Sequence, residues 1–146
     1  MITNADMTIF NSRYQAETRS ECYIPTVIRN ISAQQSEASN VNGGIWAEQS
    51  VYKIRIPFMD AEIENNRDYI PENQYREAGE IYGNWTIRKG DIVILGIYDG
   101  EKSVLSRQEV DDWAKDCHYT PIIITEYADN TTRGSDTVRH WRIGGK

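Results

Sequence analysis

The stretch Ser50-Val51-Tyr52-Lys53-Ile54-Arg55-Ile56-Pro57 is the clearest β-strand in this sequence. Its apolar side chains alternate with the charged residues Lys53 and Arg55, so one face of the strand is apolar and the other is polar. A period of two is the pattern of a strand with one buried face. Pro57 ends the strand because proline has no backbone N–H to donate to a neighbouring strand.

Segments of the same kind lie on both sides of this strand. The further segments expected to form strands are residues 6–14, 23–33, 92–97, 121–127 and 137–143. Pro25 suits an edge or the start of a strand. Lys89-Gly90-Asp91 is a turn signal, and the almost continuous apolar run that follows it is typical of a fully buried strand. About six strands are therefore expected in a single domain over residues 1–146.

One helix is expected over residues 105–117. Ser106 and Glu109 have the spacing of a capping box, and Leu105 and Val110 have that of a hydrophobic staple. The side chains expected to face the protein are those of Val110, Trp113 and Cys117, with acidic residues on the opposite face. The predicted fold class is mainly β: a small β-barrel or sandwich of about six strands with this short helix packed on it.

Two stretches are expected to be long loops or insertions. Residues 34–44 are rich in Ser, Asn and Gln and end in two glycines, so they have too little apolar surface to bury. Residues 59–83 mix acids, Asn and Tyr, with a short helix expected over residues 71–78 after a proline. Long loops often carry the contacts of a small scaffold.

Composition and charge narrow the classes of function. The formal net charge of −6 argues against nucleic acid as the main partner, because phosphate binding needs a surplus of Lys and Arg on one face. No apolar run is long enough to cross a membrane, and residues 1–6 do not begin a signal peptide, so we expect a protein made in a cytoplasm. Cys22 and Cys117 are expected to be reduced, semi-buried thiols.

The sequence offers little that indicates catalysis. His118 and His140 lack a nucleophile motif, and the adjacent Cys117 and His118 side chains would point apart in most backbones. Glu62-Ile63-Glu64 could join a divalent cation site but lacks the ligand spacing of a calcium loop. We therefore expect no enzyme activity, no catalytic residue, no cofactor and no resident metal.

Aromatic side chains are the stronger functional signal, because they bury a large area at interfaces at small entropic cost. The candidate interface residues are Trp46, Asn42, Gly43, Tyr69, Tyr75, Trp85, Arg133 and Arg139. Core packing is expected for Trp113 and Trp141 instead. The basic residues near the C-terminus, Arg133, Arg139, Arg142 and Lys146, otherwise indicate a charged strand exposed to solvent.

The order of several motifs resembles a family of uncharacterised proteins from phages and prophages of Gram-positive bacteria. The residues that carry the resemblance are Thr3-Asn4-Ala5-Asp6, Ile9-Phe10-Asn11, Tyr14, Glu17-Thr18-Arg19, Thr26-Val27-Ile28-Arg29, 51–57, Lys89-Gly90-Asp91-Ile92-Val93, Gly96, Asp129-Asn130, Arg133-Gly134 and 140–146. Such proteins are typically encoded among head and tail morphogenesis genes. The order of features is also similar to that of the head-closure proteins of long-tailed phages.

The resemblance implies a structural virion protein, a subunit of the neck ring between head and tail. Its partners would be the portal or adaptor above and tail proteins below, with further copies of itself in the ring, DNA only passing through the lumen and no membrane. A tail-terminator or tail-completion protein is the nearest alternative. A surface- or carbohydrate-binding module that uses Trp46 and the Tyr-rich segment, and a small hydrolase that uses His118 or His140, are alternatives of other classes.

Overall fold

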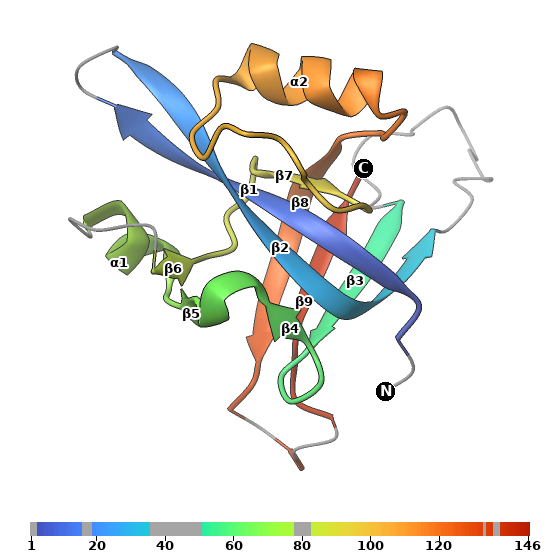
Figure 1. The fold of residues 1–146 in the computed structure, drawn as a ribbon. Helices are drawn as coiled ribbons and strands as arrows, with labels where there is room; N and C mark the ends of the chain where they lie inside the picture. The colour runs from blue at the N-terminus through green and yellow to red at the C-terminus, as the bar shows by residue number, and fades with distance from the viewer. Residues whose placement is uncertain (1–2, 16–18, 36–50, 78–82, 133, 136–137) are drawn as a thin grey trace, which may run out of the picture.

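The computed structural model describes residues 3–15, 19–35, 51–77, 83–132, 134–135 and 138–146, which form a mainly β fold (Figure 1). Six of the described strands close into a ring in the order β1-β2-β3-β9-β8-β7, and β7 pairs back to β1. Every neighbouring pair in the ring is antiparallel. The six strands are β1 (Ala5–Gln15), β2 (Ser20–Gln35), β3 (Tyr52–Pro57), β7 (Ile92–Ile94), β8 (Ile122–Asn130) and β9 (His140–Gly145). The predicted fold class is confirmed.

Shorter elements surround the ring. In the segment 59–83, where the sequence predicts a loop with one short helix, the described residues form β4 (Glu62–Ile63), the 3-10 helix η1 (Glu64–Asn66), β5 (Asp68–Tyr69) and helix α1 (Glu72–Glu77). Strand β4 pairs with β2, and β5 forms a separate parallel pair with β6 (Asn84–Trp85). The other predicted loop, residues 34–44, begins inside β2, and its residues 36–44 lie outside the described part of the chain.

Burial on β3 follows the sequence pattern. Ile54 and Ile56 are fully buried, whereas Lys53 and Arg55 between them are exposed. Strand β9 alternates in the same way, with Trp141 and Ile143 buried. The two strands pair directly, with Ile54 opposite Ile143 and Ile56 opposite Trp141, so their apolar faces point together into the ring.

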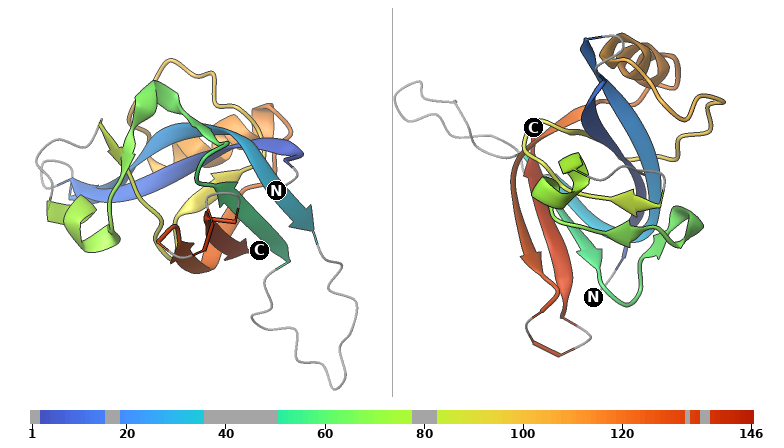
Figure 2. Two further views of the ribbon diagram at one scale, coloured as in Figure 1. Left: turned by 90° about the horizontal axis from the view of Figure 1, so that it is seen from below. Right: turned by 90° about the vertical axis from the view of Figure 1, so that its left-hand side faces the viewer.

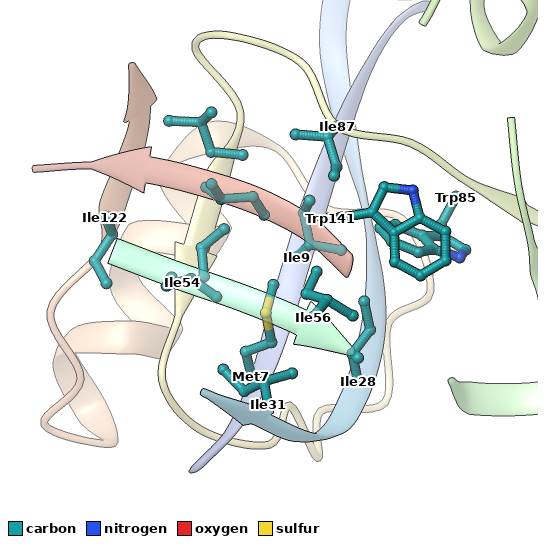
Figure 3. Close-up of a cluster of buried hydrophobic side chains, with 13 residues drawn as sticks. Met7, Ile9, Ile28, Ile31, Ile54, Ile56, Trp85, Ile87, Ile122 and Trp141 are labelled. Atoms are coloured by element: carbon teal, nitrogen blue, oxygen red, sulfur yellow. The ribbon is translucent and has the colours of Figure 1, made fainter. Parts of the chain in front are cut away.

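The inside of the ring is filled mainly by isoleucine side chains (Figure 3). The buried residues of this cluster are Met7, Ile9, Ile28, Ile31, Ile54, Ile56, Trp85, Ile87, Val93, Ile122, Ile124, Trp141 and Ile143. They come from all six strands of the ring and from the segment that leads into β7. Burial of this much apolar surface is the main favourable term in folding, and its close packing makes the ring rigid.

Strand β2 turns a corner of the ring. Its first part pairs with β1, and its last four residues pair with β3. At the bend, Asn30 has a φ of 64°, a left-handed conformation that asparagine tolerates better than most residues. The carboxylate of Asp6 accepts a hydrogen bond from the Asn30 amide (3.0 Å), and the pairing register shifts at the same place, between Ala5 and Met7. The bulge lets one long strand serve two sides of the ring.

Helix α2 (Arg107–Asp116) covers the outer side of the ring, away from the turn between β8 and β9 (Figure 2). The capping box of Ser106 and Glu109 is confirmed, and Leu105 and Val110 are buried in one cluster as expected. This cluster also contains Phe10, Ile92 and Ile94, which face outward from β1 and β7. The helix therefore packs directly on the pair of strands that closes the ring.

The predicted inner face of this helix is wrong at its last position. Cys117 is exposed, whereas Ala114 is fully buried. The helix ends at Asp116, and Cys117 already has a non-helical backbone (φ −92°, ψ 3°), so its side chain leaves the inner face. Cys22, by contrast, is buried as a free thiol, and burial raises its pKa.

The one-sided burial of β3 gives a direct test. We expect Ile54→Ala to lower the free energy of unfolding by about 2–5 kcal/mol, because it removes a fully buried side chain and leaves a cavity. The adjacent exposed control, Lys53→Ala, is expected to change it by less than about 0.5 kcal/mol. Urea unfolding of both variants measures the difference, and equal losses would contradict the observed orientation of the strand.

Candidate functional site

Three large apolar side chains are exposed at one end of the ring. Phe58 (42% exposed) and Met59 (61%) follow β3, and Val138 (53%) precedes β9. The turns that carry them are joined, because the Phe58 amide donates to the carbonyl oxygen of Arg139 (2.9 Å). We call these three residues, on two turns joined by this bond, the apolar end. Exposed apolar side chains that gather in one place mark interaction sites more often than single ones do.

The apolar end is supported from within by aromatic rings that contact one another at tilted or edge-to-face angles. The ring of Phe58 lies 5.7 Å from that of Trp141, centroid to centroid. Trp141 in turn lies 5.0 Å from Trp85 and 5.3 Å from Tyr69. We call these four residues the aromatic column. Because Trp85 and Trp141 are almost completely buried, the column fixes the position of Phe58 before any partner arrives.

The β1–β2 hairpin extends beyond the ring at a different place, next to α1 (Figures 1 and 2). Pairing continues through Tyr14 with Glu21 and Gln15 with Ser20. Tyr14 is 63% exposed, the largest exposed fraction among the large hydrophobic side chains of the described residues. The hairpin is thus a second projecting surface with an exposed aromatic side chain.

A buried carboxylate fixes the strand pair that closes the ring. Asp91 is 1% exposed, and its oxygens accept hydrogen bonds from the hydroxyl (2.6 Å) and amide (3.2 Å) of Ser12 and from the Asn11 side chain (3.2 Å). Burial raises the pKa of Asp91 to about 6, and the bonds from Ser12 and Asn11 oppose that rise. The turn before it is set by Gly90, whose φ of 93° strongly favours glycine.

Two adjoining hollows lie along the outer side of β2. Their volumes are about 270 Å³ and about 140 Å³, and both are lined by Glu64 and Tyr98. Here the edge of β2 is covered by side chains: Glu64 accepts from the Val27 amide (3.1 Å), and Arg67 donates to the carbonyl oxygen of Pro25 (2.8 Å). Such coverage protects a strand edge from pairing with another chain.

Comparison with known proteins gives a family. Residues 2–146 match the model of a family of unknown function, DUF6751. The chain belongs to this family. Neither a curated protein nor a solved structure matches the chain.

The predicted interface residues of this DUF6751 member fall into three groups. Asn42, Gly43, Trp46 and Arg133 lie outside the described residues. Tyr75 and Trp85 are only 1% and 0% exposed, so their side chains do not reach the surface of this chain. Their large apolar area is buried instead, Trp85 in the aromatic column and Tyr75 as the buried residue of α1. Tyr69 and Arg139 are half-buried and lie close to the apolar end. The ring of Tyr69 contacts that of Trp141, and the carbonyl oxygen of Arg139 accepts a hydrogen bond from the Phe58 amide.

The two histidines considered as candidate catalytic residues lie in different parts of the structure. His118 follows α2 with a φ of 61° and lines a hollow with Tyr119 and Tyr52, whereas His140 contacts the Val138 carbonyl oxygen through Nδ1 (2.7 Å). Within the described ranges, no group of three or more His, Cys, Asp or Glu side chains is arranged to hold a metal ion. No helix in that part of the chain is both long and apolar enough to span a membrane.

Sequence reasoning missed the residues of the apolar end. Phe58 lies between the predicted strand 50–57 and the predicted loop 59–83, Met59 begins that loop, and Val138 lies on one face of the predicted strand 137–143. A signal was present, because two large apolar residues directly follow Pro57, where a surface turn would normally be polar. Trp141 is buried as expected, and Trp113 is partly buried against Tyr98 (4.9 Å between ring centroids).

The buried carboxyl of Asp91 predicts a pH-dependent stability. Its folded pKa of about 6 exceeds the ordinary value of 3.8, so the folded state binds the proton more tightly. The stability gained from this proton is present at low pH and is lost as the pH rises from about 4 through about 6, by roughly 3 kcal/mol. Asp91→Asn should therefore flatten this part of the stability profile.

Urea unfolding at pH 4.5, 5.5 and 7 checks this expectation, with the exposed Asp112→Asn as the control. The difference in unfolding free energy between wild type and Asp91→Asn should change across this range, and that of the control should not. A constant difference for Asp91→Asn would contradict the raised pKa.

Proposed function

We propose that this chain is a structural subunit of the head–tail connector of a tailed bacteriophage, a head-closure protein that assembles into the neck ring. Two independent observations support the proposal. One is the resemblance in sequence to phage proteins of this kind, carried by motifs such as Lys89-Gly90-Asp91 and the C-terminal stretch 140–146. The other is the apolar end, which is the observation from the structure that carries most weight.

A connector subunit needs a rigid body with contact surfaces at its extremities. The ring interior is filled by large side chains, so the body is closely packed. In the described part of the chain, the apolar end and the hairpin around Tyr14 are two surfaces available for contact, and they belong to different parts of the strand ring. Two separate contact surfaces allow one chain to touch two neighbouring chains, as each subunit of a ring-shaped oligomer must do.

The apolar end has the composition of an interface centre. Aromatic residues and Met are enriched at such centres, and Phe58 and Met59 are of these types. The aromatic column holds Phe58 in place, so little conformational entropy is lost when a partner covers it. Within a virion we propose that the partners are the portal or adaptor above, tail proteins below and further copies of this chain.

The alternative functions make different demands on the aromatic residues. A carbohydrate-binding platform needs exposed flat rings, whereas Trp85 and Trp141 are buried and contact each other edge to face. A tail-terminator or tail-completion protein would use the same two projecting surfaces at the neighbouring joint of the virion. The position of the chain along the axis of the virion, at the neck or at the joint with the tail, therefore distinguishes these alternatives.

Electron cryomicroscopy of the neck of purified virions measures it. We expect a symmetric ring of this chain between portal and tail, with Phe58, Met59 and Val138 covered by a neighbouring subunit. A ring at the tail side would favour the tail-terminator alternative. Absence of the chain from purified virions would overturn the structural role. The net charge of −6 further suggests acidic residues facing the DNA channel, and a basic lumen would contradict that part.

Substitutions at the apolar end test the interface separately. We expect the double variant Met59→Lys/Val138→Lys to be lost from virions, because two charges would have to be buried against the partner. Its free energy of unfolding should change by less than about 1 kcal/mol, since both side chains are exposed. The control is Lys53→Ala/Arg55→Ala on the exposed side of β3. Normal incorporation of the lysine variant, measured by mass spectrometry of virions, would contradict the assigned surface.

A further inference from the structure

A group of buried hydrogen-bond donors lies where the β1–β2 hairpin runs past the ring under α1. The side-chain atoms that are buried without a hydrogen-bond partner in the described part of the chain are Arg13 Nη1, Arg67 Nε, Tyr75 OH, Thr86 Oγ1, Trp85 Nε1 and Trp141 Nε1. The two indoles belong to the aromatic column. We call the other four residues, Arg13, Arg67, Tyr75 and Thr86, the donor cluster.

Hydrogen bonds to the β1–β2 hairpin and electrostatic interactions place the residues of the donor cluster in one region. Tyr75 on α1 is within electrostatic range of Arg13, Arg67 and Asp91. Arg67 reaches β2 through its Nη1, which donates to the Thr26 hydroxyl (2.7 Å). On the β1 side, Thr86 is held by Asn11: its amide donates to Asn11 Oδ1 (3.1 Å), and its carbonyl oxygen accepts from Asn11 Nδ2 (2.6 Å).

The acceptors near the donor cluster are already engaged. Both oxygens of Asp91 accept bonds from Ser12 and Asn11. The carboxylate of Glu72, at the start of α1, pairs with Arg76 (3.1 Å) and Arg88 (3.4 Å). A buried donor without an acceptor carries a desolvation penalty that nothing offsets, so native proteins rarely leave several of them together.

Charge at the cluster favours an anion. Tyr75 is acted on by two guanidinium groups, those of Arg13 and Arg67, and by one carboxylate, that of Asp91. Burial raises the pKa of Tyr75 to about 12, so its hydroxyl stays protonated and can donate. The guanidinium nitrogens can only donate, whereas a water molecule must also donate its own two hydrogens. The two hydroxyl groups can donate or accept, so the donor-only nitrogens of Arg13 and Arg67 are what favour a group that only accepts.

We propose that the donor cluster is a binding site for a small oxyanion, a phosphate or carboxylate group held between α1 and the inner face of the β1–β2 hairpin. Charge-assisted bonds from two arginines and a tyrosine are the chemistry that recognises such a group. The site does not depend on the connector role proposed above. Because the donor atoms are inaccessible in this structure, the anion reaches them through a local opening around α1 that also exposes the buried Tyr75.

Titration with sodium phosphate and, separately, sodium acetate tests the site, with sodium chloride at equal ionic strength as the reference. We expect a saturable rise in the thermal unfolding midpoint with at least one oxyanion and none with chloride. The preferred anion distinguishes a tetrahedral from a planar ligand. Arg13→Gln should weaken the apparent affinity about tenfold or more, and Tyr75→Phe, which keeps the buried ring, should weaken it several-fold.

The matched control is Arg55→Gln, which removes an exposed arginine from the polar side of β3. Its affinity for the anion should equal that of the wild type. If Arg13→Gln does not fold, Tyr75→Phe carries the test. Equal effects of phosphate, acetate and chloride would overturn the proposal, as would an anion response that Tyr75→Phe leaves unchanged or that Arg55→Gln weakens as much as Arg13→Gln does.

Discussion

Closure of the strand ring depends on the short contact between β1 and β7. Strand β7 has only three residues, and its pairing with β1 covers Thr8 to Phe10. Three residue pairs alone are a weak connection, and Asp91 directly before β7 strengthens it through its bonds to Ser12 and Asn11 on β1. The Asp91 carbonyl oxygen also accepts from the Ile124 amide (2.9 Å), so one residue joins the strands on both sides. Without this contact, β1 and β7 would be open edges.

Apolar side chains cover the same contact from both sides. Ile9 and Val93, which are paired across β1 and β7, point into the ring, and Phe10 and Ile92 point outward under α2. Helix α2 therefore helps to keep the ring closed, because it covers the outward-facing side chains of the β1–β7 pair. Removing the charged carboxylate of Asp91 from water costs free energy in these apolar surroundings. Its hydrogen bonds to Ser12 and Asn11 on β1 are therefore needed to stabilise the charged form.

The position of the contact surfaces follows from this closed core. Because the inside is filled, functional side chains lie outside it, and in the described part of the chain the candidates lie at the ends of strands, on the hairpin and between the ring and the short elements around it. The apolar end uses the first of these places, Tyr14 the second and the donor cluster the third. The aromatic column links the apolar end to the core, so a partner that binds Phe58 contacts a surface already ordered by Trp141 and Trp85. Preorganisation of this kind favours stable assembly.

The sequence by itself determined the local elements, because periods of two and 3.6 and the chemistry of caps and turns depend only on near neighbours in the chain. It predicted the alternating strands β3 and β9, the capping box of α2 and the turn at Gly90. Only the tertiary structure decided which side chains are buried outside these alternating patterns. Tyr75 and Trp85 looked like interface residues but lie inside, Phe58 and Met59 lie outside, and Asp91 in a turn became a buried carboxylate. The physical reason is that burial and strand pairing arise from contacts between distant segments, as between Asn11 and Thr86, which no local pattern encodes.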